Sequence, residues 1–124
     1  MNTNTEFYDI DTVLDHYVNC ALWSSTEGDE GTPMDSLDAE LAPESEEVMR
    51  KDCAAFVTLI DELGIDATQN WNAEQLGHDL WLTRNGHGAG FWDRGHDEGD
   101  ALSNAARSMG QCDLYLGYDG AIHL

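Results

Sequence analysis

The sequence predicts an α+β fold in which about three main helices pack on one small antiparallel sheet of about four strands, formed by two hairpins. Two aromatic-rich runs separated by a turn sequence indicate the first hairpin, and an Asp-Gly turn indicates the second. Apolar residues at helical spacing in three other stretches indicate the helices. The chain of 124 residues is expected to form a single domain over 1–124, because domains commonly have about 100–150 residues.

Two helices are predicted in the N-terminal half of the chain. The first spans about 10–24, where apolar residues at helical spacing follow Asp9 and Asp11, either of which is a suitable N-cap. The second spans about 43–63, because Pro43 suits the first turn of a helix and the glutamates after it favour the positive end of the helix dipole.

The segment between these helices, about 24–43, is rich in serine, glycine and acidic residues and is predicted to be a long loop. Loops of this length in compact domains are either mobile or functional. A solvated acidic connector and a binding segment are both open interpretations of its composition.

A central hairpin is predicted from the runs 80–84 and 89–94, which flank the turn sequence Asn-Gly-His-Gly. Before it, Asn72 and Gln75 resemble a capping pair for one helical turn that ends at Gly77. Closing the hairpin with Asn at 85 opposite Gly at 88 sets Asp79 against Arg94, which favours this register because an ion pair forms. Its large aromatic side chains are predicted to be structural, namely Trp81, Phe91 and Trp92.

The C-terminal part is predicted to contain a third helix and the second hairpin. Small and apolar residues at helical spacing over about 101–109 indicate a helix that is closed by Gly110. The runs 113–118 and 121–124 flank Asp119-Gly120, and Asp-Gly is a strong signal for a tight hairpin turn.

The charge of the chain is its most unusual property. Acidic residues number 25 against 5 basic ones, so the formal net charge is −20. Such a charge repels nucleic acids and anionic membrane surfaces, and direct binding to either is not expected. Three interpretations are open: a solubilised surface, an adaptation to a high-salt cytoplasm, or a surface that occupies a protein site which normally receives nucleic acid. An excess of one sign on this scale is larger than solubility requires.

The densest acidic stretch lies in the predicted loop and at the start of the second helix. Its carboxylates are expected to stand where phosphates would lie in a basic cleft. The candidate partner-binding residues are Asp29, Glu30, Asp35, Asp38, Glu40, Glu44, Glu46 and Glu47. A secondary candidate surface lies on the central hairpin, where cations beside aromatic residues are typical of interface hot spots. Its residues are Arg84, Asn85, His87 and Arg94.

No catalytic residue, metal site or cofactor is assigned from the sequence, and the chain is predicted not to be an enzyme. The three cysteines lie far apart and form no C-x-x-C pair, which favours free thiols in a reducing cytoplasm. No nucleophile elbow, zinc-protease motif or P-loop occurs. The alternative hypothesis is a small metal-binding or hydrolytic domain that uses the pairs His78-Asp79 and His96-Asp97 of the central hairpin. In the predicted register His87 lies about 17 Å away from both pairs, too far to share their metal.

The N-terminal residues lack the basic region of a signal peptide, and no apolar run approaches the ~20 residues needed to cross a bilayer. These observations predict a soluble protein of the cytoplasm.

Most of the chain resembles a family of small acidic proteins encoded by bacteriophages and related mobile elements, for which no settled activity is known. The longest shared motif is Gly77-His-Asp-Leu-Trp-Leu-Thr-Arg-Asn-Gly-His-Gly-Ala-Gly-Phe-Trp-Asp-Arg-Gly95, in which Leu80 stands where the family pattern has phenylalanine. Shorter segments also carry the resemblance, namely 20–26, Leu41-Ala-Pro-Glu44, Asp52-Cys53 and 108–120. The resemblance implies a phage protein that acts inside a bacterial host.

Charge and resemblance together predict a non-enzymatic phage accessory protein with an anti-defence function. It would act as an acidic DNA mimic in the host cytoplasm, where protein–protein contacts block a host nucleic-acid-binding protein of a restriction, CRISPR or similar system.

Overall fold

The computed structural model describes residues 3–27, 32–34, 39–87 and 89–124. Within them the chain forms α1 (Thr3–Phe7), α2 (Ile10–Ser24), α3 (Pro43–Glu62), α4 (Ala73–Arg84) and α5 (Gly99–Ser108), with a short 3-10 helix, η2 (Phe91–Asp93). Strands β1 (Thr26–Glu27) and β2 (Thr32–Pro33) form one two-stranded antiparallel sheet, and β3 (Tyr115–Leu116) and β4 (Ile122–His123) form another.

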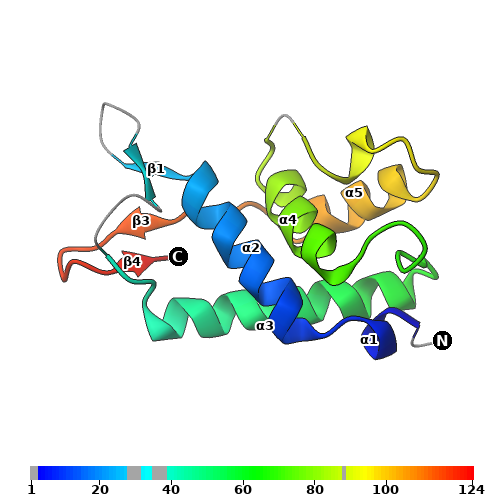
Figure 1. The fold of residues 1–124 in the computed structure, drawn as a ribbon, viewed down its shortest axis with the longest axis horizontal. Coiled ribbons are helices and arrows are strands. Elements are labelled where there is room, and N and C mark those ends of the chain that lie inside the picture. Colours follow the sequence, from blue (N-terminus) through cyan, green and yellow to red (C-terminus); the bar gives the residue numbers. More distant parts are fainter. Residues whose placement is uncertain (1–2, 28–31, 35–38, 88) are drawn as a thin grey trace.

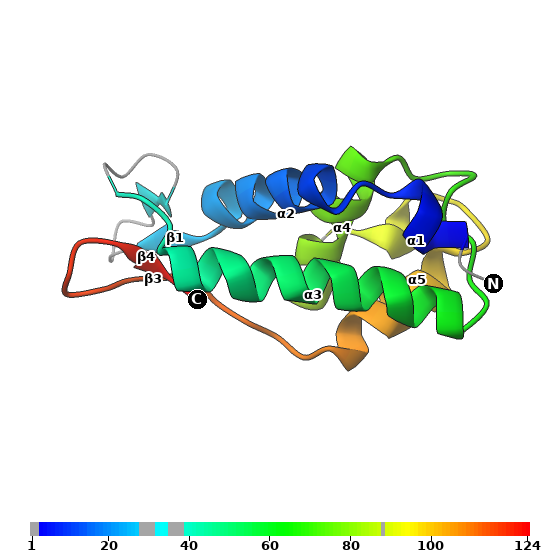
Figure 2. The same cartoon turned by 90° about the horizontal axis from the view of Figure 1, so that it is seen from below.

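Helix α3 runs along most of the length of the molecule, and α2 crosses over it (Figure 1). Helix α4 packs against α2, and α5 packs against both α3 and α4. Both small sheets lie at one end of the molecule, whereas α1 lies at the other (Figure 1, Figure 2).

The described part of the chain is mostly helical, so the predicted α+β fold with one sheet of about four strands is wrong. The C-terminal hairpin forms as predicted, but its strands have two residues each and belong to a sheet separate from β1 and β2. One isolated bridge joins Leu41 to Ile122. Strands this short cover little apolar surface, so the core is built by helix–helix packing.

The three helices predicted from apolar spacing are confirmed as α2, α3 and α5. Pro43 occupies the start of α3, and Glu44 and Glu46 lie in its first turn, as predicted. The apolar stripe of α3 is buried, with Met49, Cys53, Phe56, Val57 and Ile60 inaccessible to solvent. Amphipathic spacing is therefore the signal that identified these helices correctly.

The predicted central hairpin is wrong, because its first strand is the second half of helix α4. The capping pair is confirmed, since the Asn72 side chain accepts a hydrogen bond from the Gln75 backbone N–H at 2.8 Å. The helix then continues through Gly77 to Arg84 instead of ending after one turn. Residues 80–84 are all buried, and periodicity cannot distinguish such a run in a helix from one in a strand.

The second predicted strand, 89–94, contains η2, which a buried hydrogen bond holds against α4. The Thr83 hydroxyl accepts this bond from the Phe91 backbone N–H at 3.0 Å. At Gly90 the two segments lie so close that a Cβ would stand 2.1 Å from the Thr83 hydroxyl oxygen. Gly90 therefore serves a close contact between helical segments rather than a hairpin turn.

The aromatic core lies between α3, α4 and η2. Phe91 stacks on Phe56 with 5.6 Å between ring centres and meets the edge of Trp71 at 5.5 Å. Burial of Trp81 and Phe91 confirms their predicted structural role, whereas Trp92 is 42% exposed and lies outside the core.

Gly77 allows α4 to cross α2 in backbone contact. A Cβ at this position would stand 2.2 Å from the Val13 carbonyl oxygen and 3.0 Å from the Tyr17 backbone nitrogen. Gly77 was predicted to end a helical turn, but it lies inside helix α4. A residue with a side chain at this position would clash with the backbone of α2, so glycine is needed here.

Replacing Gly77 with alanine is expected to lower the free energy of unfolding by about 1–3 kcal/mol, because the added methyl group pushes α2 and α4 apart. Helix propensity alone would raise that free energy by about 1 kcal/mol. Urea denaturation measures the change in the free energy of unfolding, and its sign shows whether the helix contact or helix propensity dominates. A variant more stable than the native protein would mean that the two helices are not in backbone contact.

Candidate functional site

The acidic residues near the starts of α2 and α3 surround one cation. Arg50 of α3 donates a hydrogen bond to Asp11 of α2, and this bond raises the pKa of Arg50. The charges of Glu46 and Glu47 also raise the Arg50 pKa, so both carboxylates lie near the same guanidinium. Carboxylates from two helices thus converge on one face of the molecule.

Four of the predicted partner-binding residues lie in the described part of the chain, and all four are exposed. We call them the α3-start carboxylates: Glu40, Glu44, Glu46 and Glu47. The backbone carbonyl of Glu40 accepts a hydrogen bond from the Ile122 N–H at 2.8 Å, which ties this segment to the C-terminal sheet. The other predicted residues lie outside the described part, namely Asp29, Glu30, Asp35 and Asp38.

Three of the five basic residues form ion pairs with carboxylates of the same chain. Each pair has no net charge of its own, so the pairs leave the net charge of −20 to the other charged residues of the chain. The guanidinium groups in these pairs are already engaged and are poor candidates for binding an anionic ligand. The pairs are Arg50 with Asp11, Arg84 with Asp52, and Arg94 with Asp79.

Arg84 was predicted as part of a binding surface, but its side chain is buried among four helical segments. Its guanidinium donates to Asp52 of α3 at 2.7 Å and to the Tyr17 hydroxyl of α2 at 3.0 Å. It also donates to the carbonyls that end α5, Gly110 at 2.6 Å and Met109 at 3.3 Å. Burial opposes the charge of Arg84, yet the bond to Asp52 raises its pKa, so it stays ionised and has a structural role.

Arg94 forms the ion pair that was predicted with Asp79, although it joins α4 to the residue after η2 and not two strands. The buried Asp79 carboxylate accepts two hydrogen bonds from Arg94, at 3.0 and 2.5 Å. It accepts a third from the Trp71 indole N–H at 2.9 Å. Arg94 therefore neutralises a buried charge while part of its side chain remains at the surface.

Asn85, His87 and Arg94 line two adjoining hollows beyond the end of α4, so three residues of the secondary candidate surface do come together. The hollows have volumes of about 420 and 580 Å³ and share Ser24 and His87. In the larger hollow the Trp23 ring stacks on His78 with 5.8 Å between ring centres. This surface is aromatic and polar, and Arg84 is not part of its lining.

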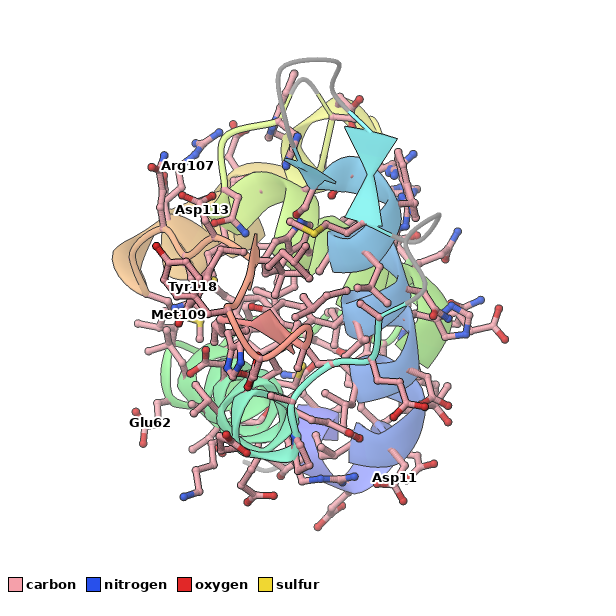
Figure 3. The ribbon with its side chains drawn as sticks, turned by 90° about the vertical axis from the view of Figure 1, so that its left-hand side faces the viewer. Asp11, Glu62, Arg107, Met109, Asp113 and Tyr118 are labelled. Atoms are coloured by element: carbon pink, nitrogen blue, oxygen red, sulfur yellow. The ribbon has the colours of Figure 1, made fainter. Side chains whose placement is uncertain are left out.

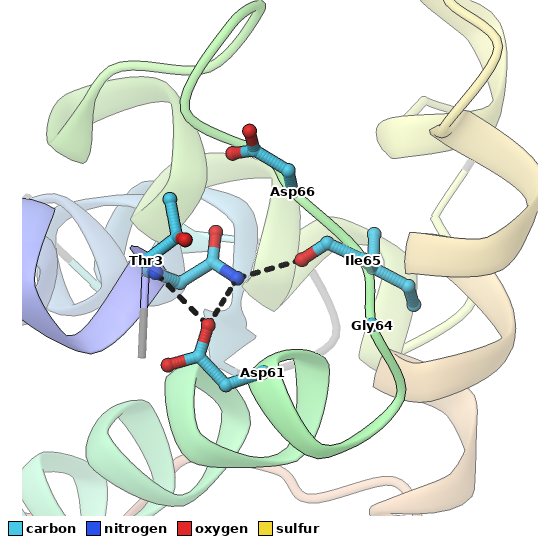
Figure 4. Close-up of a pocket in the computed structure, with 6 residues that line it drawn as sticks. Thr3, Asp61, Gly64, Ile65 and Asp66 are labelled. Carbon is cyan, nitrogen blue, oxygen red and sulfur yellow. Dashed lines mark hydrogen bonds between the residues drawn. The ribbon is translucent and has the colours of Figure 1, made fainter. Parts of the chain in front are cut away.

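A third hollow, of about 310 Å³, lies where α1 meets the end of α3 (Figure 4). The Asn4 side chain donates to Asp61 and to the Ile65 carbonyl, each at 2.6 Å, and accepts from the Ala67 N–H. Desolvation by itself would raise the pKa of Asp61. Hydrogen bonds from Asn4 and Thr5 outweigh this effect, so the pKa of Asp61 is lowered. These polar groups form their hydrogen bonds within the chain. The hollow is therefore part of the contact by which α1 packs on the end of α3, and its role is structural.

The alternative hypothesis of a metal site requires a group of ligands. In the described residues no three His, Cys, Asp or Glu side chains are grouped so that they could hold a metal. His78 contacts Trp23, whereas His96 meets the edge of Trp71 at 5.2 Å. His78 and His96 thus take part in different aromatic contacts.

All three cysteines are free thiols, as predicted. Burial raises the pKa of Cys20 and of Cys53 to about 12, so both thiols remain protonated near neutral pH. A thiol in this state is a poor nucleophile.

Comparison of the chain with protein-family models, with curated proteins and with solved structures found no match. None of the helices in the described residues is long and apolar enough to span a bilayer.

Replacing Arg94 with methionine is expected to lower the free energy of unfolding by about 3 kcal/mol, because the buried Asp79 carboxylate loses its bidentate partner. The double variant Asp79→Asn, Arg94→Met should lose less than the sum of the two single variants, since the pair acts as a unit. Urea denaturation measures both effects.

The matched control is Arg107→Met, at an exposed position of α5, with an expected change within about 0.5 kcal/mol. Equal stability of the Arg94 and Arg107 variants would mean that Arg94 is dispensable for the fold and free to act in binding.

Proposed function

We propose that this protein is a non-enzymatic inhibitor that occupies the basic cleft of a nucleic-acid-binding protein, with its carboxylates in the positions of phosphates. The observation that carries the proposal is a net charge of −20 on an accessible surface of 6763 Å². Pairing of three cations within the chain supports it, because few positive groups are left among the exposed carboxylates of the described residues.

The placement of the acidic residues suits a cleft that contacts its ligand from more than one side. Exposed carboxylates lie on α2, at the start of α3 and around the start of α5, and include Asp15, Glu44, Glu47, Asp97 and Asp100. Residues three or four apart on a helix have Cβ atoms about 5–6 Å apart, and Glu44 and Glu47 are such a pair. Closely spaced charge of this kind is what a surface that binds duplex DNA recognises, because DNA carries one phosphate per ~1.7 Å of its axis.

Long-range attraction would bring the two proteins together rapidly and would weaken as salt screens it. The resemblance to bacteriophage proteins suggests that the target is a defence component, such as a restriction or CRISPR nuclease, in the cytoplasm of a bacterial host. No catalytic step is needed, since occupation of the cleft is sufficient for inhibition.

The proposal is tested by capture from a bacterial lysate with the immobilised full chain, at about 50 mM and about 500 mM salt. Nucleic-acid-binding proteins with basic clefts are expected to be retained at low salt and released at high salt. Recovery of no such protein at low salt contradicts the proposal.

Neutralising the α3-start carboxylates is expected to weaken binding of a captured partner at least about tenfold at low salt, because attraction to the cleft falls. The variant is Glu40→Gln, Glu44→Gln, Glu46→Gln, Glu47→Gln, and isothermal calorimetry measures the dissociation constant. The matched control removes four exposed charges elsewhere, with Glu6→Gln, Glu62→Gln, Glu74→Gln and Asp113→Asn. Equal losses in the two variants would show that only total charge matters and not its position.

Adaptation to molar salt makes a different prediction about folding. A protein adapted in that way requires screening of its carboxylates and should unfold at ~10 mM salt, where the Debye length is about 30 Å. We expect the native protein to remain folded there, as judged by circular dichroism, because its core is closed by large buried aromatic side chains. Unfolding at low salt would favour salt adaptation over mimicry.

A further inference from the structure

The hairpin β3–β4 exposes a cluster of aromatic and apolar side chains. Tyr115 is 53% exposed, Leu116 is 38% exposed and Tyr118 is fully exposed. Single exposed apolar residues are ordinary, but several on one small element are typical of an interaction site. The hairpin projects from the helical body (Figure 2), and Figure 3 looks onto the end of the molecule that carries it, with Tyr118 labelled.

Hydrogen bonds hold the tip of this hairpin in one conformation. The Gly117 N–H donates to the Ala121 carbonyl at 2.8 Å, and the Gly120 N–H donates to the Gly117 carbonyl at 3.1 Å. The Asp119 carboxylate accepts a further bond from the Ala121 N–H at 3.0 Å. The tip is therefore ordered before any partner arrives, which reduces the entropy lost on binding.

A carboxylate lies beside the exposed tyrosines. Asp119 pairs with His123 at 3.0 Å, and the His123 ring stacks on Tyr115 with 5.5 Å between ring centres. Hydrogen bonds from Ala121 and His123 lower the pKa of Asp119, so its carboxylate is ionised under physiological conditions. Aromatic faces and a negative charge are thus presented together.

The hairpin also adjoins the α3-start carboxylates. The Ala42 N–H donates to the Ile122 carbonyl and the Ile122 N–H donates to the Glu40 carbonyl, each at 2.8 Å. Two residues further, the Leu124 N–H donates to the Ser45 hydroxyl at 3.0 Å. Strand β4 therefore runs beside the segment that leads into α3, so the hairpin and the α3-start carboxylates are neighbours in the structure.

We propose that the tip of the β3–β4 hairpin anchors the protein to a basic partner protein by receiving arginine side chains, stacked on Tyr115 or Tyr118 and paired with Asp119 or Glu40. The proposal rests on the proposed function, because the partner must present a basic surface. Charge complementarity favours a cationic occupant over an anionic one. Arginine suits the surface better than lysine, since its planar guanidinium stacks on an aromatic face while it pairs with a carboxylate.

The test uses arginine-only and lysine-only peptides of equal length as probes, with dissociation constants measured by calorimetry on the full chain at low salt. The native protein is expected to bind the arginine peptide more tightly by about two- to fivefold per tyrosine. In the variant Tyr115→Leu, Tyr118→Leu this preference should disappear while the affinity for the lysine peptide is kept. The matched control is Phe7→Leu, which removes a ring that is 57% exposed on α1 and should leave the preference unchanged.

The outcomes separate the anchor from the proposed function. Equal affinity of the native protein for the two peptides, or an unchanged arginine preference in the leucine variant, overturns the anchor and leaves the acidic mimic intact. Failure of the native protein to bind either peptide overturns both. Tyr118→Leu alone, at a fully exposed position, supplies the same readout if the double variant does not fold.

Discussion

The buried guanidinium of Arg84 is the interaction on which the arrangement of the helices depends. It stands at the last residue of α4 and meets Tyr17 of α2, Asp52 of α3 and the two carbonyls that follow α5. Desolvating such a cation costs several kcal/mol unless hydrogen bonds and a counter-charge compensate it. The negative end of the α5 dipole adds to this compensation. The position of α4 relative to three other helical segments is thereby fixed.

The fixed position of α4 determines which groups reach the surface. After Arg84 the chain returns along α4 and forms η2, which packs against this helix. Arg94, the residue after η2, then pairs with the buried Asp79 of α4. Two cations are thus used to compensate carboxylates of the fold, and a third pairs at the surface with Asp11. Most other acidic side chains in the described part of the chain are exposed. Their mutual repulsion is opposed by a core closed with Trp71, Trp81, Phe56 and Phe91. Because these cations are engaged in ion pairs within the protein, its exposed surface is strongly negative and suited to attract basic partners.

Amphipathic helices and local capping were readable from the sequence. The apolar stripe of α3 fixes its phase, so the exposure of Glu44, Glu46 and Glu47 follows from the burial of Met49 and Cys53. The Asn72 and Gln75 pair and the Asp119-Gly120 turn depend on neighbouring residues only, and both were predicted correctly.

Helix α4 was missed because its second half is buried on every side and therefore shows no period of 3.6 residues. Its glycine was interpreted as a stop signal, although the structure uses Gly77 for contact with α2. An arginine inside an apolar run does indicate a buried ion pair. With 25 acidic residues in the chain, however, that pattern could not single out Asp52, which lies on a different helix. The exposed tyrosines of β3–β4 were likewise missed, because a two-residue strand has no alternation from which to assign a face.

The central claim is that carboxylates of this protein occupy the site where a partner binds nucleic acid, and competition tests it most directly. A captured partner is titrated with labelled duplex DNA at several fixed concentrations of this protein, and the apparent dissociation constant for DNA is measured. If both ligands compete for one site, this constant rises linearly with the concentration of this protein, and no complex contains both ligands. Formation of a ternary complex of partner, DNA and this protein, with the affinity for DNA unchanged, would contradict this claim.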